Sequence, residues 1–364
     1  ETRKTSANSQ LSKRVDDSVR PQDAPFFSET LSESAATQRA DVGIGPYKTY
    51  APKGPLGFGA GRRRQTPFNS SGGIHMFLAS PITFPNLGIE INPSPVAFTV
   101  FGKDIYWYGI IIAAGFLLAV FYMLSRAKDF GVTQDDVLDM ILWAGPIGVV
   151  CARLYYCIFY WELYADDPIS ILYIWEGGLA IYGGIIGGAI TLLVVAKHKK
   201  IPATVLLDVA GMGVIIGQLV GRWGNFMNRE AHGAVTDTFL KMGLQDVSGV
   251  VTYYHPTFLY ESVWNLVGFI GLHFFSKKRK FDGEVFLAYV AWYGLGRVWI
   301  EGLRTDSLYL FSTGIRVSQL VAAVSFLAAG GVLAWVLIKK KPTPDTLYVN
   351  RRRNESQEGE KQAD

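Results

Sequence analysis

The stretch "VAGMGVIIGQLVGRWGNFMNREAHG", residues 209–233, decides how the rest of the chain is interpreted. Its first half is almost purely apolar, and the chain then turns within a few positions to Arg222, Asn225 and Asn228. An apolar run of about 20 residues is long enough to cross a bilayer, and the run that ends here begins at residue 203. Polar side chains three residues apart at the end of such a run indicate a lined pocket.

The composition of the whole chain is typical of a membrane protein. Of the 364 residues, 49% are hydrophobic and only 18% are charged, whereas soluble domains carry about a quarter charged residues. Cys151 and Cys157 are six residues apart, so on a helix they point to different faces and cannot bridge. There is no C-x-x-C pair, zinc spacing or H-E-x-x-H motif. The cysteines and histidines therefore do not indicate a zinc protease.

Seven apolar runs are long enough to span a bilayer. The predicted fold is an all-α polytopic membrane protein with seven transmembrane helices and a small extracytoplasmic loop region. The expected spans are residues 105–124, 137–160, 178–196, 203–221, 257–275, 284–303 and 316–338.

The loops between these runs predict the topology. Basic clusters recur in alternate loops, as "KHKK" at 197–200 and "KKRK" at 277–280, and again as "KKK" at 339–341. Basic residues concentrate in cytoplasmic loops. We therefore expect the C-terminus in the cytoplasm, and the N-terminal segment and the loop after residue 221 outside.

The chain is expected to have three parts. Residues 1–75 are rich in Ser, Thr, Gln, Pro and Gly without periodicity, and should be a disordered extension. The first methionine is Met76, so we expect this extension not to be native. Residues 76–340 should form the membrane domain, and residues 341–364 a charged cytoplasmic tail.

Arginines inside or at the ends of the spans are the strongest chemical signal. A charge at the bilayer centre costs about 2.5–3.5 kcal/mol, so Arg153, Arg222 and Arg297 should face the protein interior and pair or bind a ligand. Arg297 and Glu301 are four apart, and a pair that only locks helices together is one alternative. Arginine donors suit phosphate. Several arginines around one cavity favour an anionic ligand, most simply a phospholipid head group.

Two further polar clusters precede or open spans. "HPTFLYE" contains His255, Tyr260 and Glu261, and ordinary helix capping beside an interfacial aromatic residue would also explain it. "YWYG" contains Tyr108, for which an aromatic anchor at the membrane surface is the alternative.

"GRWGNFMNREAHG" resembles the signature of the prolipoprotein diacylglyceryl transferases, G-R-x-G-N-F-hydrophobic-N-x-E-x-x-G. "YWYG", "WEGGLAIYGG", "HPTFLYE" and "GRVWIEGLR" are similar to that family in order and spacing, and so is Asp208. The similarity covers about residues 77–340. The fixed positions of the signature are Gly221, Arg222, Gly224, Asn225, Phe226, Asn228, Glu230 and Gly233.

The resemblance implies a reaction. A diacylglyceryl group would move from phosphatidylglycerol to the lipobox cysteine of a prolipoprotein signal peptide, forming a thioether and releasing glycerol phosphate. This is the first step of lipoprotein maturation in the bacterial plasma membrane, with the site near the extracytoplasmic face. The implied partners are phosphatidylglycerol, the prolipoprotein and membrane lipid, without nucleic acid, metal or cofactor.

The resemblance also implies roles. Arg222 and Arg297 should hold the phosphate and stabilise its growing charge. Many members have a histidine, a candidate base, where this chain has Tyr182, so the group that takes the thiol proton stays open. Candidates are Glu230, Glu301, His255 and Tyr182, or the arginines alone lower the pKa of the thiol. The expected substrate-binding residues are Tyr108, Arg153, Gly177, Gly178, Gly183, Asn225, Asn228, Gly233, His255, Tyr260, Glu261 and Arg304.

Two other classes of protein compete with this interpretation. A transporter with an anion site would explain intramembrane arginines, but it predicts internal repeats, which the sequence lacks. A lipid-binding scaffold without catalysis is the second, supported only by Tyr182. His232 lies at a position that the signature leaves open and is expected to be a bystander.

Overall fold

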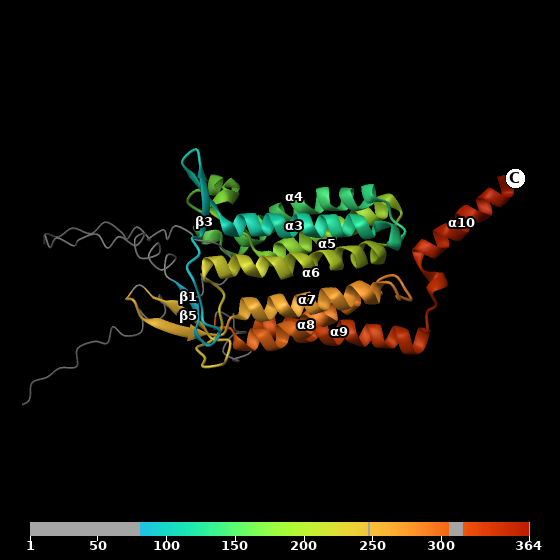
Figure 1. Cartoon of the computed structure of the whole chain (residues 1–364). Helices are drawn as coiled ribbons and strands as arrows, with labels where there is room; N and C mark the ends of the chain where they lie inside the picture. The colour runs from blue at the N-terminus through green and yellow to red at the C-terminus, as the bar shows by residue number, and fades with distance from the viewer. Residues whose placement is uncertain (1–80, 247, 306–315, 364) are drawn as a thin grey trace, which may run out of the picture. The chain divides into compact units, whose positions relative to one another are not determined.

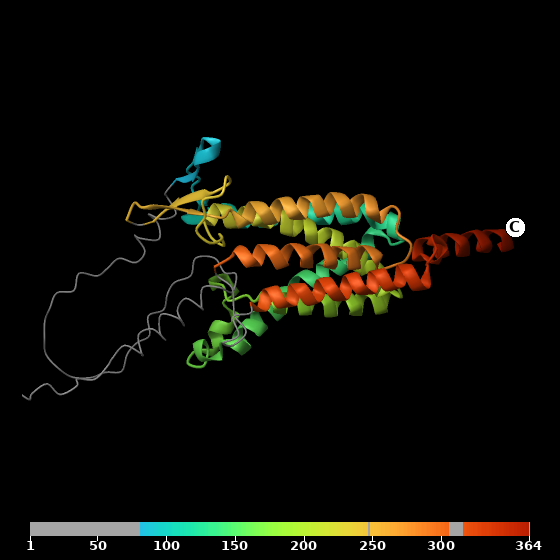
Figure 2. The ribbon, with the colours of Figure 1, turned by 90° about the horizontal axis from the view of Figure 1, so that it is seen from below.

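The structure, a computed structural model, describes residues 81–246, 248–305 and 316–363. The predicted N-terminal extension, residues 1–75, lies outside the described residues. In these described ranges, seven long helices run alongside one another, and an eighth follows at the C-terminal end (Figures 1 and 2). They are α3 (Trp107–Arg126), α4 (Gln134–Phe159), α5 (Ile181–Lys199), α6 (Ala203–Asn228), α7 (Thr257–Ser276), α8 (Glu284–Leu303), α9 (Val317–Trp335) and α10 (Tyr348–Ala363).

Five of the described helices are long and apolar enough to cross a membrane. They are α3 with the 3₁₀ turn η2 (Ala127–Phe130), α4, α5, α6, and α9 with the π turn η6 (Val336–Lys340). The prediction of a polytopic, mostly helical membrane protein is thus confirmed. α7 and α8 fall outside this set because polar residues such as Glu261, Arg297 and Glu301 reduce their apolar character.

Several helix boundaries differ from the expected spans. The first span was expected to begin at residue 105, but strand β4 (Lys103–Tyr106) precedes the helix. The third begins only at Ile181, because Gly177 and Gly178 have positive φ angles of 95° and 71°, which stop a helix. The fourth continues to Asn228, so most of the signature is helical.

The expectation of an all-α chain needs correction, because the structure also contains β-strands. The strands have three to five residues each, too few to leave a clear alternating pattern. A hairpin pairs β3 (Val96–Val100) with β4. A four-stranded antiparallel sheet has the order β2-β1-β5-β6, made of β2 (Ile89–Ile91), β1 (Ile82–Phe84), β5 (Met242–Gln245) and β6 (Val251–Tyr254).

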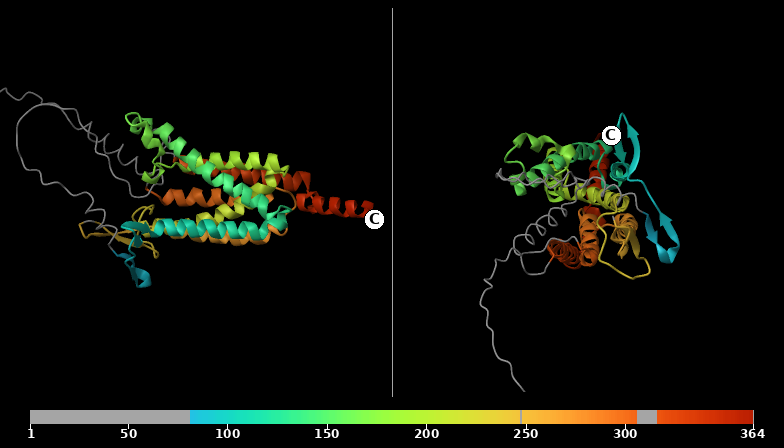
Figure 3. Two further views of the ribbon diagram at one scale, coloured as in Figure 1. Left: turned by 90° about the horizontal axis from the view of Figure 1, so that it is seen from above. Right: turned by 90° about the vertical axis from the view of Figure 1, so that its left-hand side faces the viewer.

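The sheet packs on the ends of two helices. Ile82 and Leu244 are buried against Phe226 of α6 and Phe258 of α7. Figure 3 shows the strands gathered at one end of the helices and α10 at the other. The sheet therefore covers the helix ends that carry the signature.

α6 is the central helix of the main hydrophobic core. In the most apolar stretch of α6, 50% of the residues are buried. The corresponding share for α9 at the periphery is 11%. Near its first turn, Asp208 accepts the backbone N–H groups of Gly283 and Phe286 at 2.8 Å each. These donors belong to the first turn of α8 and the residue before it, where N–H groups lack helical partners. Asp208 thus fixes the start of α8.

α7 and α8 are joined by a reciprocal tryptophan pair. The rings of Trp264 and Trp292 stack at 4.3 Å with an interplanar angle of 15°. The indole of Trp264 donates to the carbonyl of Trp292 at 3.1 Å, and the reverse bond measures 3.0 Å. A Cβ atom at Gly268 or Gly296 would collide with the facing indole, so glycine is needed at both positions.

Candidate active site

One buried carboxylate joins three helices. Glu261 of α7 accepts from Arg222 of α6 at 2.5 Å through Oε1, and from Arg297 of α8 at 3.1 Å through Oε2. The side chain of Glu261 is 3% exposed, whereas those of Arg222 and Arg297 are 21% and 17% exposed. The carboxylate thus fixes two guanidinium groups that both remain accessible.

The contacts continue along α8 beyond this centre. Arg297 Nη2 lies 2.7 Å from Glu301 Oε2, as the spacing of four residues predicts. The pair is not isolated, because Arg297 also bonds to Glu261 on another helix. Arg304 ends α8, and its backbone N–H donates to the carbonyl of Glu301 at 3.2 Å.

The signature supplies the other branch of the network. Its polar residues recur every three positions and therefore share one face of α6. Arg222 donates to Asn225 Oδ1 at 3.2 Å. Asn225 and Asn228 donate to the same oxygen of Glu230, at 2.9 and 3.3 Å. We call the connected set the Arg–Glu network. Its members are Arg222, Asn225, Asn228, Glu230, Glu261, Arg297 and Glu301.

Glu230 reaches this position because the helix ends just before it. Arg229 adopts a left-handed conformation with φ of 55°, and the chain then turns back over the helix end. Burial raises the pKa of Glu230, while the hydrogen bonds from Asn225 and Asn228 and the charges of Arg304 and Arg222 oppose the rise.

Gly233 ties the end of the signature to the other two helices. Its N–H donates to the carbonyl of His255 at 2.9 Å, and it forms a β-bridge with Arg304. A Cβ atom there would lie 2.7 Å from His255 Cβ and 2.9 Å from the carbonyl oxygen of Leu303. Glycine is therefore required for the signature to lie between the start of α7 and the end of α8.

Two predicted aromatic positions border the network. The ring of Tyr108 packs on α6, where a Cβ at Gly224 would lie 2.8 Å from it. His255 Nδ1 lies 3.4 Å from the hydroxyl of Tyr260, and burial lowers the pKa of His255, which favours its neutral form.

The remaining predicted residues form a second cluster around α4. Arg153 is 5% exposed and donates to the carbonyls of Ser170 at 2.7 Å and Ile171 at 2.8 Å. It also bonds to the carbonyls of Gly177 and Gly178. Among the described residues, Arg153 hydrogen-bonds to no member of the Arg–Glu network. Its guanidinium instead orders the segment before α5.

Two more predicted residues lie at the start of α5. A Cβ at Gly183 would lie 2.6 Å from Tyr155 Cβ, so this glycine lets α5 pack closely on α4. Tyr182 follows the first residue of α5 and is 42% exposed. The part of the chain that the structure describes holds no group of three His, Cys, Asp or Glu residues suited to a metal.

Arg229 is a residue that the sequence did not single out. It is 3% exposed and donates to Asn92 Oδ1 at 3.3 Å and to the carbonyl of Pro93 at 3.2 Å. Burial lowers the pKa of Arg229. The signature leaves this position open, so no pattern in the sequence indicated a buried arginine that fastens the N-terminal strands to the end of α6.

Comparison with known proteins identifies the family. Residues 95–335 match the family described as "Prolipoprotein diacylglyceryl transferase". A phosphatidylglycerol–prolipoprotein diacylglyceryl transferase from Enterococcus faecalis is 47% identical over 267 residues, covering 70% of this chain and 94% of that protein. Proteins of the same name from Lactiplantibacillus plantarum and Lysinibacillus sphaericus are 44% and 40% identical, covering 66% and 70% of this chain and 89% and 95% of those proteins. The chain therefore belongs to the prolipoprotein diacylglyceryl transferase family.

Proposed function

We propose that this protein transfers the diacylglyceryl group of phosphatidylglycerol to the lipobox cysteine of prolipoproteins. The observation that carries the proposal is the pair Arg222 and Arg297, both accessible and both fixed by the buried carboxylate of Glu261. Such a pair can bind the phosphate of one lipid head group with preorganised donors. The names of the relatives give the same lipid, transferred group and class of acceptor protein.

The arginines have a defined part in the reaction. The cysteine sulfur forms a bond to the glyceryl carbon of the lipid while the bond from that carbon to the phosphate oxygen breaks. Negative charge then grows on the departing glycerol phosphate, and Arg222 and Arg297 stabilise it. A guanidinium carries five N–H donors, and the hydrogen bonds of Arg222 to Glu261 and Asn225 engage only two of its nitrogens.

The thiol proton needs an acceptor, for which we propose Glu230. A cysteine thiol has a pKa of about 8.5. Because the pKa of Glu230 is raised, this carboxylate is a stronger base toward the thiol than a carboxylate with an ordinary pKa. Two hydrogen bonds from Asn225 and Asn228 orient it beside Arg222. Among the other candidates, Glu301 is paired with Arg297, and Tyr182 and His255 stay as alternatives.

We also propose that all seven long helices span the bacterial plasma membrane. α7 and α8 pack on α6 and on each other, and α8 also packs on α9, which supports two further spans. The basic clusters at 197–200, 277–280 and 339–341 would then face the cytoplasm. The Arg–Glu network would lie near the extracytoplasmic face, where secreted preproteins emerge.

The proposal is tested by incubating the purified protein in detergent with phosphatidylglycerol and a lipobox peptide. We expect the peptide to gain the mass of a diacylglyceryl group on its cysteine, with release of glycerol phosphate. The matched control peptide has serine in place of that cysteine and should gain nothing. A purely lipid-binding scaffold or a transporter would give no mass gain and no glycerol phosphate, and that result would reject the proposal.

A further inference from the structure

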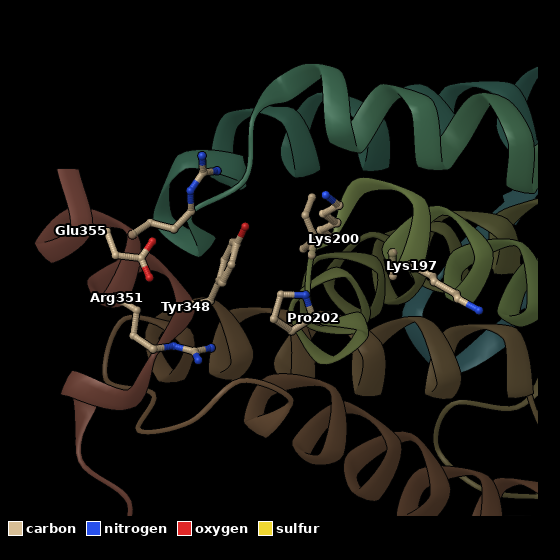
Figure 4. Close-up of a pocket in the computed structure, with 9 residues that line it drawn as sticks. Lys197, Lys200, Pro202, Tyr348, Arg351 and Glu355 are labelled. Carbon is tan, nitrogen blue, oxygen red and sulfur yellow. The ribbon is translucent and has the colours of Figure 1, made fainter. Parts of the chain in front are cut away.

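A pocket lies at the end of the helices opposite the Arg–Glu network. It has a volume of about 370 Å³ and is formed where α5 meets α6 and the start of α10 (Figure 4). Pro202 in its wall precedes Arg222 by twenty residues, or about 30 Å along α6. The pocket is thus separate from the transfer site. The polar side chains in its wall are Lys197, Lys200, Tyr348, Arg351, Arg352 and Glu355.

The wall opposite α10 is formed by the end of α5 and the residues just before α6. α5 ends at Lys199, and Lys200 takes a left-handed conformation with φ of 57°. The next backbone N–H, of Ile201, donates to the carbonyl of Ala196 at 3.0 Å. Ala196 and Ile201 are both buried and line the pocket.

The wall from α10 is docked through its first turn only. The N–H of Tyr348 donates to Asp282 at 2.9 Å, and Leu347 is buried. Val349 packs closely on Gly131, because a Cβ atom added at position 131 would lie 2.7 Å from Val349 Cα. Residues 351–358, which follow this turn, are polar and exposed, and isolated short helices are marginal in water.

Three of the four cations in the pocket wall have no carboxylate partner in the part of the chain that the structure describes. The fourth, Arg351, lies 4.0 Å from Asp282, and Lys199 next to the pocket is paired with Asp136 and Asp139. Among the described residues, no carboxylate forms an ion pair within 4.0 Å with Lys197, Lys200 or Arg352. Figure 4 shows Tyr348 on one side of the hollow and Lys200 and Pro202 on the other.

From this arrangement we propose that the pocket binds a phosphate anion, carried by a phospholipid of the adjacent leaflet, and so fastens α10 to the helices. Lysine, arginine and a tyrosine hydroxyl are suitable donors to phosphate. The outer face of α5, a membrane-spanning helix, exposes Ile190, Leu193 and Val194 at 56%, 54% and 62%. These residues lie within the two turns before Lys197, so acyl chains would rest there.

Hydrogen exchange of the α10 amides in nanodiscs tests the proposal. The full protein is compared in phosphatidylcholine, in phosphatidylcholine with phosphatidic acid, and in phosphatidylcholine with inorganic phosphate. Ligand at ten times its Kd slows exchange from the undocked state about tenfold. We expect this slowing with phosphatidic acid. Slowing with inorganic phosphate alone would assign the pocket to a free anion instead of a lipid.

Three variants distinguish binding of phosphate in the pocket from non-specific electrostatic attraction of α10 to anionic lipid. Lys200→Ala and Arg352→Ala should each lose most of the slowing. Arg353→Ala removes the same charge from the neighbouring position of α10, which does not line the pocket, and should retain it. Unchanged exchange in α3 shows that each variant is folded. Absence of slowing with either phosphate source, or equal losses in Arg352→Ala and Arg353→Ala, would overturn the proposal. Because exchange is read at α10, this outcome is independent of diacylglyceryl transfer.

Discussion

At the residue scale, the site depends on how Glu261 is shared. A buried carboxylate is costly unless it is paired and hydrogen-bonded, and Glu261 meets this condition through Arg222 and Arg297. The same pairing orients both guanidinium groups before any lipid arrives. Stability of the three-helix junction and the proposed recognition of phosphate therefore depend on the same side chains.

Arg222→Lys should separate charge from geometry. Lysine retains a positive charge but cannot donate in one plane to Glu261 and Asn225 while also holding a phosphate. We expect the rate of transfer to fall on the order of 10²-fold, measured as mass gain of the lipobox peptide over time.

The matched control for this substitution is Arg126→Lys at the C-terminal end of α3, away from the Arg–Glu network. Arg126 is also buried and bonds to Ser276 at 3.0 Å and Asp129 at 2.7 Å. Its loss should lower the melting temperature while transfer stays near the wild-type rate. Equal rates for the two variants would contradict the role assigned to Arg222.

Glu230→Gln should change how stability depends on pH. Because burial raises the pKa of Glu230 above its ordinary value of 4.5, the folded protein binds more protons than the unfolded chain in the window just above 4.5. Stability from this group is therefore greatest at low pH and falls as the pH rises through the raised pKa. Glutamine cannot titrate, so the melting temperature of the wild type minus that of the variant should decrease with pH. A difference that stays constant or increases would contradict the assigned direction.

Part of the site could be predicted from the sequence, and the reason is local geometry. Arg222, Asn225 and Asn228 are three residues apart, so helical spacing alone brings them together. The bond between Arg222 and Glu261 joins residues 39 positions apart, which only the packing of α6 on α7 decides. The carbonyl partners of Arg153 could not be predicted, because they lie in an irregular segment without a periodic pattern, and substrate binding by Arg153 stays a prediction.

At the element scale, the pairing of α7 and α8 controls where Glu261 and Arg297 meet. The stacked tryptophans lie one turn from Glu261 on α7 and just over one turn from Arg297 on α8. Glycines at positions 268 and 296 allow this close approach. The helices themselves were predictable from their apolar runs, whereas the reciprocal stacking needs the crossing geometry, which one sequence does not contain.

Gly296→Ala should therefore reduce both stability and transfer. The added methyl would meet the Trp264 indole, and overpacking of this kind costs about 1–3 kcal/mol, more than the roughly 1 kcal/mol that alanine gains over glycine in a helix. Gly271→Ala in α7 is the control, because a Cβ there meets nothing within 4 Å. We expect a lower melting temperature and slower transfer for the first and neither for the second. A Gly296→Ala protein as stable as Gly271→Ala would show that the stack is not tight.

At the scale of the whole molecule, the two ends of the helices differ in chemistry. One end carries the Arg–Glu network and the sheet, and the other carries the basic clusters and the pocket beside α10. Loop charge predicts the orientation from sequence. The sheet escaped prediction because its strands come from segments more than 150 residues apart, β1 and β5, and each is very short.

Cysteine labelling in intact cells tests that orientation. In a variant with Cys151 and Cys157 replaced by serine, one cysteine is introduced at Thr238, which is exposed near the sheet, or at Lys340, which is exposed at the end of η6. Moving a cluster such as 277–280 to the outside would place four basic residues away from the anionic cytoplasmic leaflet, at about 1 kcal/mol each. A membrane-impermeant maleimide should thus label the cysteine at 238 in intact cells and that at 340 only after permeabilisation. The reverse pattern would invert the topology, and it would place the Arg–Glu network on the side of the membrane where no secreted preprotein presents its lipobox.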